Sequence, residues 1–123
     1  ANPSKLDTNS NIIDFTNALS LDQVWHLCNK AKYVITTDSG ILHLAGTTDT
    51  EIIYLAMGRN PAFTAPYRHG SQNYKMKVIS NNCNWCMSDA TSIIKSKQAF
   101  LLECLYVDKL CEPTVDQVIE AIQ

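Results

Sequence analysis

The sequence predicts an α/β fold with a parallel sheet flanked by helices. Three observations predict it: short apolar segments recur along the chain, segments of helical periodicity lie between them, and the apolar segments lack strict alternation with polar residues. Strands without alternation are expected where helices cover both faces of a parallel sheet, and right-handed crossovers place the helices on those faces. Because the chain has 123 residues, of which 46% are hydrophobic and 18% are charged, we expect one domain over residues 1–123.

The first elements expected along the chain are a strand over residues 12–15 and a helix that begins near Leu21. Ser20 and Gln23 have the spacing of a helix capping box. In this helix the apolar residues recur at three- and four-residue spacing, as expected for a face that packs on a sheet. That face consists of Leu21, Val24, Trp25, Cys28 and Ala31.

Two more strands, with a helix between them, are expected next. Residues 33–37 and residues 52–56 are short apolar segments that predict strands. Residues 40–45, which lie between them, predict a short helix. The resulting order is strand, helix, strand, helix, strand, which is typical of a parallel sheet.

The rest of the chain is expected to hold a loop, a fourth strand and a final helix. Residues 58–70 are rich in proline, asparagine and small residues and predict a loop on the ligand-binding side, and residues 77–80 predict a strand. Thr114 and Gln117 form a second capping box, which predicts the start of the final helix. The apolar stripe of that helix consists of Val115, Val118, Ile119 and Ile122.

Charge and hydropathy argue against two classes of partner. A formal net charge of −2 and a pI near 5.8 provide no broad positive field for nucleic acid. The longest strongly apolar run, residues 52–57, is far shorter than the roughly 20 residues of a membrane-spanning helix. The five cysteines are an odd number without a signal segment, so a cytoplasmic protein is expected rather than a disulfide framework.

The segment Asp38-Ser39-Gly40 carries the clearest sign of a binding site, because it follows an expected strand and opens an expected helix. In parallel α/β sheets, ligands bind outside the carboxyl ends of the strands. A glycine in the first turn of a helix lets unpaired amides approach a phosphate or pyrophosphate closely. Ser39 adds a hydroxyl donor, and His43 lies one turn further on, where it is expected to point back towards the same anion. Asp38 would repel phosphate and is expected to accept hydrogen bonds from sugar hydroxyls.

Both arginines of the chain, Arg59 and Arg68, fall in the loop after the third expected strand and are predicted to contact the anion. Simpler alternatives remain open for each of these residues. Asp38 or Ser39 would only cap the following helix, His43 would be a partly buried histidine with satisfied hydrogen bonds, and the arginines would be solvated loop residues.

Residues 33–46 resemble a family signature. They read Tyr-Val-Ile-Thr-Thr-Asp-Ser-Gly-Ile-Leu-His-Leu-Ala-Gly, which is similar to the strand-Asp-Ser/Thr-Gly-x-x-His-x-Ala motif of glycosyltransferase family nine, the heptosyltransferase family. The helix start near Ser20, the strand and turn over residues 52–58, the Pro66-Tyr67 pair and the terminal Thr-x-x-Gln-Val helix also resemble that family in the same order. The resemblance covers roughly residues 11–123.

The resemblance implies the Rossmann-like, C-terminal half of a GT-B glycosyltransferase, which binds a nucleotide-diphosphate sugar. The family transfers the sugar, without a required metal or cofactor, to a glycan or lipid-linked acceptor of the cell envelope, as in lipopolysaccharide biosynthesis. This places the chain in the cytoplasm or at the inner membrane surface. An acidic residue of a separate first domain would activate the acceptor, so we expect no catalytic residue here and weak or no donor binding by this chain alone. The predicted donor-binding residues are Asp38, Ser39, Gly40, His43, Thr37, Arg59 and Arg68.

Three features depart from the family. Glu51 stands where family members usually carry proline, Gly58-Arg59-Asn60 replaces a Gly-Pro-Thr-like turn, and a basic residue before the first helix is replaced by Ala18 or Leu19. The donor sugar and the nucleotide base are therefore left open. In the sheet of this fold, two further strands would lie between those found here. Their absence would expose strand edges, so either a homodimer or an altered strand pairing is expected.

Four cysteines, Cys83, Cys86, Cys104 and Cys111, suggest a structural zinc site, because zinc is commonly held by four thiolates. The second pair is spaced more widely than usual, so packing as small apolar residues, expected also of Cys28, remains an alternative. A second hypothesis is therefore a zinc-stabilised, non-catalytic α/β module that mediates protein association. Elemental analysis of the purified protein tests it, and a zinc-free protein whose thiols all react freely would exclude zinc.

Overall fold

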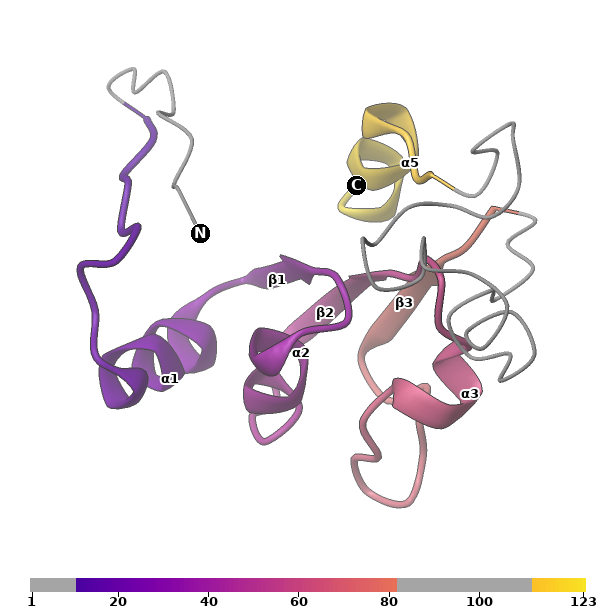
Figure 1. Ribbon diagram of the computed structural model, residues 1–123, viewed down its shortest axis with the longest axis horizontal. Coiled ribbons are helices and arrows are strands. Elements are labelled where there is room, and N and C mark those ends of the chain that lie inside the picture. Colours follow the sequence, from indigo (N-terminus) through magenta and orange to yellow (C-terminus); the bar gives the residue numbers. More distant parts are fainter. Residues whose placement is uncertain (1–10, 82–111) are drawn as a thin grey trace, which may run out of the picture.

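The computed structural model (Figure 1) describes residues 11–81 and 112–123. Three parallel strands, β1 (Tyr33–Thr36), β2 (Glu51–Leu55) and β3 (Met76–Ile79), form one sheet in the order β1-β2-β3. The α/β fold with a parallel sheet is confirmed. Consecutive strands pair directly, with no further strand between them in the described residues, which is an altered pairing relative to the sheet of this fold.

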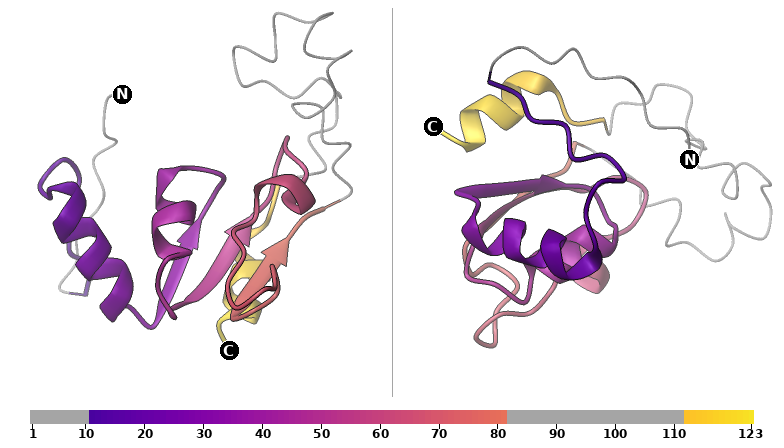
Figure 2. Two further views of the ribbon diagram at one scale, coloured as in Figure 1. Left: turned by 90° about the horizontal axis from the view of Figure 1, so that it is seen from below. Right: turned by 90° about the vertical axis from the view of Figure 1, so that its left-hand side faces the viewer.

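Helices lie on both faces of the sheet (Figures 1 and 2). The helices α1 (Leu21–Lys30), α2 (Gly40–Ala45) and α3 (Pro61–Thr64) lie on one face. The helix α5 (Val115–Ala121) lies on the other face, next to β3. None of the helices in the described ranges has the length and apolar character needed to cross a membrane.

Two of the helices begin with the capping contacts that the sequence predicts. The Ser20 hydroxyl accepts from the Gln23 amide at 3.3 Å, and the Gln23 side chain accepts from the Ser20 amide at 2.9 Å. Thr114 and Gln117 make the same reciprocal contacts at 3.2 and 2.9 Å. Both capping boxes are therefore confirmed, because each satisfies two amides that the helix itself leaves unpaired.

The core lies between the sheet and the helices α1 and α2. The inward positions of the strands alternate, as the pleat of a strand requires. Cys28 packs there, so its expected role as a small apolar core residue is confirmed, whereas the expected core residue Leu21 is 75% exposed. The buried core cluster consists of Cys28, Val34, Leu42, Ala45, Ile52, Tyr54, Ala56, Ala65 and Met76.

Residues 12–15 do not form a strand. The Asp14 carboxylate accepts hydrogen bonds from the Thr16 amide at 2.8 Å and from the Thr16 hydroxyl at 2.5 Å. Such a local side-chain turn competes with strand pairing. Ile13 is consequently 74% exposed, so the apolar character of these residues does not place them in the described sheet.

The predicted loop over residues 58–70 contains the short helix α3, which the sequence interpretation missed. Asn60 caps this helix by accepting from the Ala62 amide at 2.9 Å, and Pro61 occupies its first turn. An asparagine cap followed by proline is a recognised helix start. The expected apolar stripe of α5 is only partly covered, because Val115 and Ile119 are exposed.

Candidate functional site

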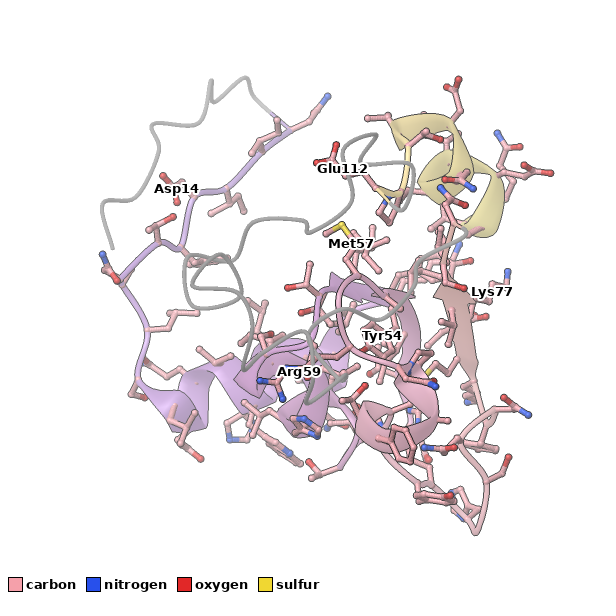
Figure 3. The ribbon with its side chains drawn as sticks, turned by 45° about the vertical axis from the view of Figure 1, so that its right-hand side comes forward. Asp14, Tyr54, Met57, Arg59, Lys77 and Glu112 are labelled. Atoms are coloured by element: carbon pink, nitrogen blue, oxygen red, sulfur yellow. The ribbon has the colours of Figure 1, made fainter. Side chains whose placement is uncertain are left out.

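The loops that follow β1 and β2 meet at the carboxyl edge of the sheet, where ligands of parallel α/β sheets bind. Asp38 lies in the loop after β1, and Arg59 lies in the loop after β2. Figure 3 shows Arg59 and Met57 on the segment that leaves β2. The structure thus brings together side chains that are 21 positions apart in the sequence (59 minus 38).

Asp38 lies between the side chains of Arg59 and His43. Its carboxylate is 3.6 Å from Nε of Arg59 and 3.7 Å from Nε2 of His43. The Asp38 side chain is 21% exposed, whereas those of Arg59 and His43 are 54% and 57% exposed. These separations are longer than good hydrogen bonds, and exposed ion pairs contribute little to stability. Arg59 and His43 can therefore turn towards an anionic ligand at small cost.

The exposure of His43 bears on its alternative interpretation. A structural histidine with satisfied hydrogen bonds would be buried among the core residues of α2, as Leu42 and Ala45 are. His43 is instead exposed and faces Asp38. The alternative of a partly buried histidine is therefore wrong, and the contact of His43 with an anion stays a prediction.

Ser39 occupies the N-cap position of α2, but its side chain makes no capping hydrogen bond. Its hydroxyl lies 3.2 Å from the Thr36 hydroxyl instead, and the Thr36 hydroxyl also donates to the carbonyl of Thr37 at 3.1 Å. The plain-capping alternative is therefore wrong for Ser39. Its hydroxyl is held close to the end of β1, beside the exposed residue Thr37.

Gly40 is exposed, and a Cβ atom placed on it would meet no other atom within 4 Å. The space above the first turn of α2 is therefore open. Because α2 has only six residues, the cation beside this space is the Arg59 guanidinium, which lies next to Asp38 together with the His43 ring.

Arg68 does not join this group, contrary to the expectation that both arginines lie at one site. Its side chain is 5% exposed and lies at the amino edge of the sheet, where β2 and β3 begin. Two residues of one predicted loop thus reach opposite edges, because the chain runs through α3 between Arg59 and Arg68.

The Arg68 guanidinium joins the starts of the two strands. Nη1 donates to the carbonyls of Thr48 at 3.0 Å and Thr50 at 2.7 Å, and Nη2 donates to those of Tyr74 at 2.6 Å and Lys75 at 2.7 Å. Burial lowers the pKa of Arg68, while the charges of Asp49 and Tyr74 raise it. With four carbonyl partners, this arginine holds the fold and is not available to a ligand.

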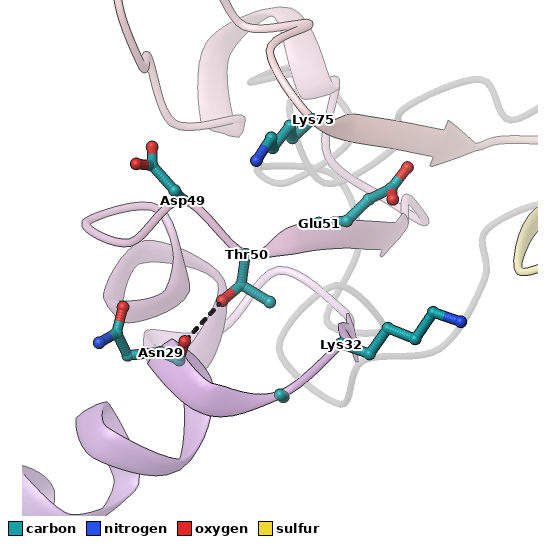
Figure 4. A pocket seen from close by; sticks show the side chains of 7 residues that line it. Asn29, Lys32, Asp49, Thr50, Glu51 and Lys75 are labelled. Carbon is teal, nitrogen blue, oxygen red and sulfur yellow. Dashed lines mark hydrogen bonds between the residues drawn. The ribbon is translucent and has the colours of Figure 1, made fainter.

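A surface depression of about 300 Å³ also lies at the amino edge (Figure 4). Its lining includes two carboxylates, of Asp49 and Glu51, and two ammonium groups, of Lys32 and Lys75. The Thr50 hydroxyl beside them donates to the Cys28 carbonyl at 2.7 Å. The charges that line this depression have both signs, and none of its lining residues belongs to the predicted donor-binding group.

The zinc prediction rests on Cys83, Cys86, Cys104 and Cys111, which lie outside the described residues. Within residues 11–81 and 112–123, no group of three or more histidine, cysteine or acidic side chains is arranged to hold a metal ion. Burial raises the pKa of the remaining cysteine, Cys28, which keeps its thiol protonated in the core.

Two residues near the site were not predicted from the sequence. Thr36 contacts Ser39, and Tyr54 is fully buried in β2 beneath the Arg59 segment. A tyrosine inside an apolar strand was a usable signal, because a buried tyrosine hydroxyl requires a hydrogen-bond partner.

The family model of Glycosyltransferase family 9 (heptosyltransferase) matches residues 4–95. This match includes the three strands, the Asp38-Ser39-Gly40 segment and Arg59. A comparison with curated proteins found no match. A comparison with solved structures found none either.

Proposed function

Because the chain belongs to glycosyltransferase family 9, the heptosyltransferase family, we propose that it binds the nucleotide-diphosphate sugar from which the glycosyl group is transferred. The binding site would lie at the carboxyl edge of the sheet, over the first turn of α2. The observation that carries this proposal is the grouping of Asp38, Arg59 and His43 beside the open space at Gly40.

The diphosphate would lie next to the cationic side chains. Arg59 offers a guanidinium, which suits phosphate oxygens because it can donate two parallel hydrogen bonds. His43 offers a ring nitrogen beside the other carboxylate oxygen of Asp38. The lack of a side chain at Gly40 leaves room for the phosphates, and the Ser39 hydroxyl can donate once it turns from Thr36.

Asp38 would contact the sugar rather than the phosphates. Its carboxylate accepts hydrogen bonds only, so hydroxyl groups are suitable partners and phosphate oxygens are not. The adjacent Arg59 and His43 offset its charge and allow a carboxylate to stand close to a diphosphate. This division of contacts assigns sugar recognition to Asp38, and Thr37 precedes it at the rim of the same loop.

The acceptor in this proposal is a glycan or lipid-linked molecule of the cell envelope, and its hydroxyl would be activated by a residue of another domain. This chain would supply the donor side of the reaction. Its contribution to the transfer step would be to hold the diphosphate, which leaves with the nucleotide, next to positive charge. Such charge stabilises a leaving group as negative charge develops on it.

An NMR titration of the ¹⁵N-labelled chain with ADP and with UDP tests the proposal. We expect amide shifts at Ser39, Gly40 and His43, while the amide of Lys75 at the amino edge stays in place. The method detects binding with Kd of about 1 mM, which matters because a single domain is expected to bind weakly. Adenosine and uridine, which lack phosphates, serve as controls and should leave these amides unshifted.

The result that would overturn the proposal is equally specific. If neither nucleotide shifts the amides of Ser39 and Gly40, or if the shifts cluster at the amino edge, then the carboxyl edge of this sheet is not a donor site.

A further inference from the structure

The hydroxyl of Tyr54 is a polar group inside the core. Tyr54 occupies β2, and none of its surface is exposed. Its hydroxyl lies 2.7 Å from the hydroxyl of Thr64, the last residue of α3. A buried tyrosine hydroxyl finds a partner because leaving it unpaired is costly. This hydrogen bond is therefore a specific link between the sheet and α3.

The direction of this hydrogen bond follows from a second contact. The Thr64 hydroxyl also donates to the carbonyl of Asn60 at 3.3 Å. A threonine hydroxyl has one hydrogen to donate. Its oxygen must therefore accept from Tyr54, and the chain of donors runs from Tyr54 through Thr64 to Asn60, which directly follows Arg59.

Other contacts also hold the segment that carries Arg59: Arg59 pairs with Asp38, and Ala65 lies in the core cluster. Asn60 caps α3 through the Ala62 amide, and the Gln72 side chain donates to the carbonyls of Ala65 at 2.9 Å and Ala62 at 3.1 Å. These contacts keep the segment in shape. The Tyr54 hydroxyl adds the hydrogen bond that connects this shaped segment to the strand beneath it.

The pKa of Tyr54 is raised, and the main cause is burial. Burial raises the pKa of Tyr54 and the Thr64 hydrogen bond lowers it, with smaller effects from the charges of Asp38, which raises it, and Arg59, which lowers it. Tyr54 and Arg59 are both labelled in Figure 3.

We propose that Tyr54 is a positioning residue of the donor site: through Thr64 it holds Arg59 at the distance from Asp38 at which the guanidinium meets the diphosphate. The inference rests on the proposed function. Without the hydroxyl, the Arg59 segment loses this hydrogen bond to β2, and the guanidinium samples more positions. Donor affinity falls because the ligand must then order that segment on binding.

The test compares Tyr54→Phe and Thr64→Val with the unmodified chain in an NMR titration, using whichever of ADP and UDP the unmodified chain binds more tightly. Each variant removes one hydroxyl with little change in shape. We expect Kd to rise about three- to tenfold, the range of one lost hydrogen bond. Thr50→Val is the matched control, since it removes a buried hydroxyl bonded to a carbonyl at the amino edge and should leave Kd unchanged.

A double-mutant cycle with Arg59→Ala distinguishes positioning from a general loss of structure. If Tyr54 acts through Arg59, then Tyr54→Phe has no further effect on Kd once Arg59 is absent. An equal rise in Kd in both backgrounds would overturn the inference, as would an unchanged Kd in Tyr54→Phe alone. Failure of the proposed function would look different, because the unmodified chain would then bind neither nucleotide.

Discussion

Replacing Arg68 with methionine is expected to lower the free energy of unfolding by about 3–4 kcal/mol. Methionine keeps much of the side-chain length but donates nothing, so the carbonyls of Thr48, Thr50, Tyr74 and Lys75 lose a buried partner. An unpaired buried acceptor costs about 1–3 kcal/mol, and the position of these carbonyls at the sheet edge lets water satisfy part of them.

Urea unfolding followed by circular dichroism measures this loss. The matched control is Arg59→Met, which removes an arginine that is exposed and loosely paired. Its unfolding free energy should change by no more than about 0.5 kcal/mol. Equal effects of the two substitutions would show that Arg68 does not hold β2 and β3 together.

Replacing Gly40 with valine is expected to abolish donor binding and to leave the fold intact. A side chain on Gly40 would project into the open space that the diphosphate is proposed to occupy. The same openness means that the new side chain meets no protein atom, and Gly40 is not among the residues with positive φ. The backbone can therefore accept a β-branched residue without strain.

The NMR titration with ADP and UDP measures this loss of affinity. In Gly40→Val, neither nucleotide should shift the amide of Ser39. Ile41→Val is the control, because it places the same side chain one residue further along α2, at an exposed position. That variant should bind as the unmodified chain does. Unchanged affinity in Gly40→Val would remove the first turn of α2 from the site.

Features that depend on neighbours in the sequence were predicted correctly, except for the start of α3, whose local signal of Asn60 and Pro61 was missed. Both capping boxes form as their spacing indicates, because each contact joins residues three positions apart. The strands β1, β2 and β3 lie within one or two residues of their predicted bounds. The strand predicted over residues 12–15 does not form. A strand requires a hydrogen-bonded partner, and the sequence of the strand itself does not specify that partner.

The two arginines show most clearly which features the sequence does not determine. Arg59 and Arg68 have the same chemistry and lie in one predicted loop, yet one is exposed at the carboxyl edge and the other is buried at the amino edge. Their spacing in the sequence carries no information on this point, because α3 and the return to β3 decide where the chain crosses from one edge to the other.

By itself the sequence determined the α/β class, the helix starts and the family motif around Asp38, because periodicity, capping and a contiguous motif are all encoded within a few neighbouring residues. Only the tertiary structure decided which side chains join Asp38. Arg59 reaches it and Arg68 does not, and Tyr54 lies beneath the segment that carries Arg59. The physical reason is that a parallel sheet brings together the carboxyl ends of strands that are distant in the chain, so the composition of the site is set by crossovers rather than by local sequence.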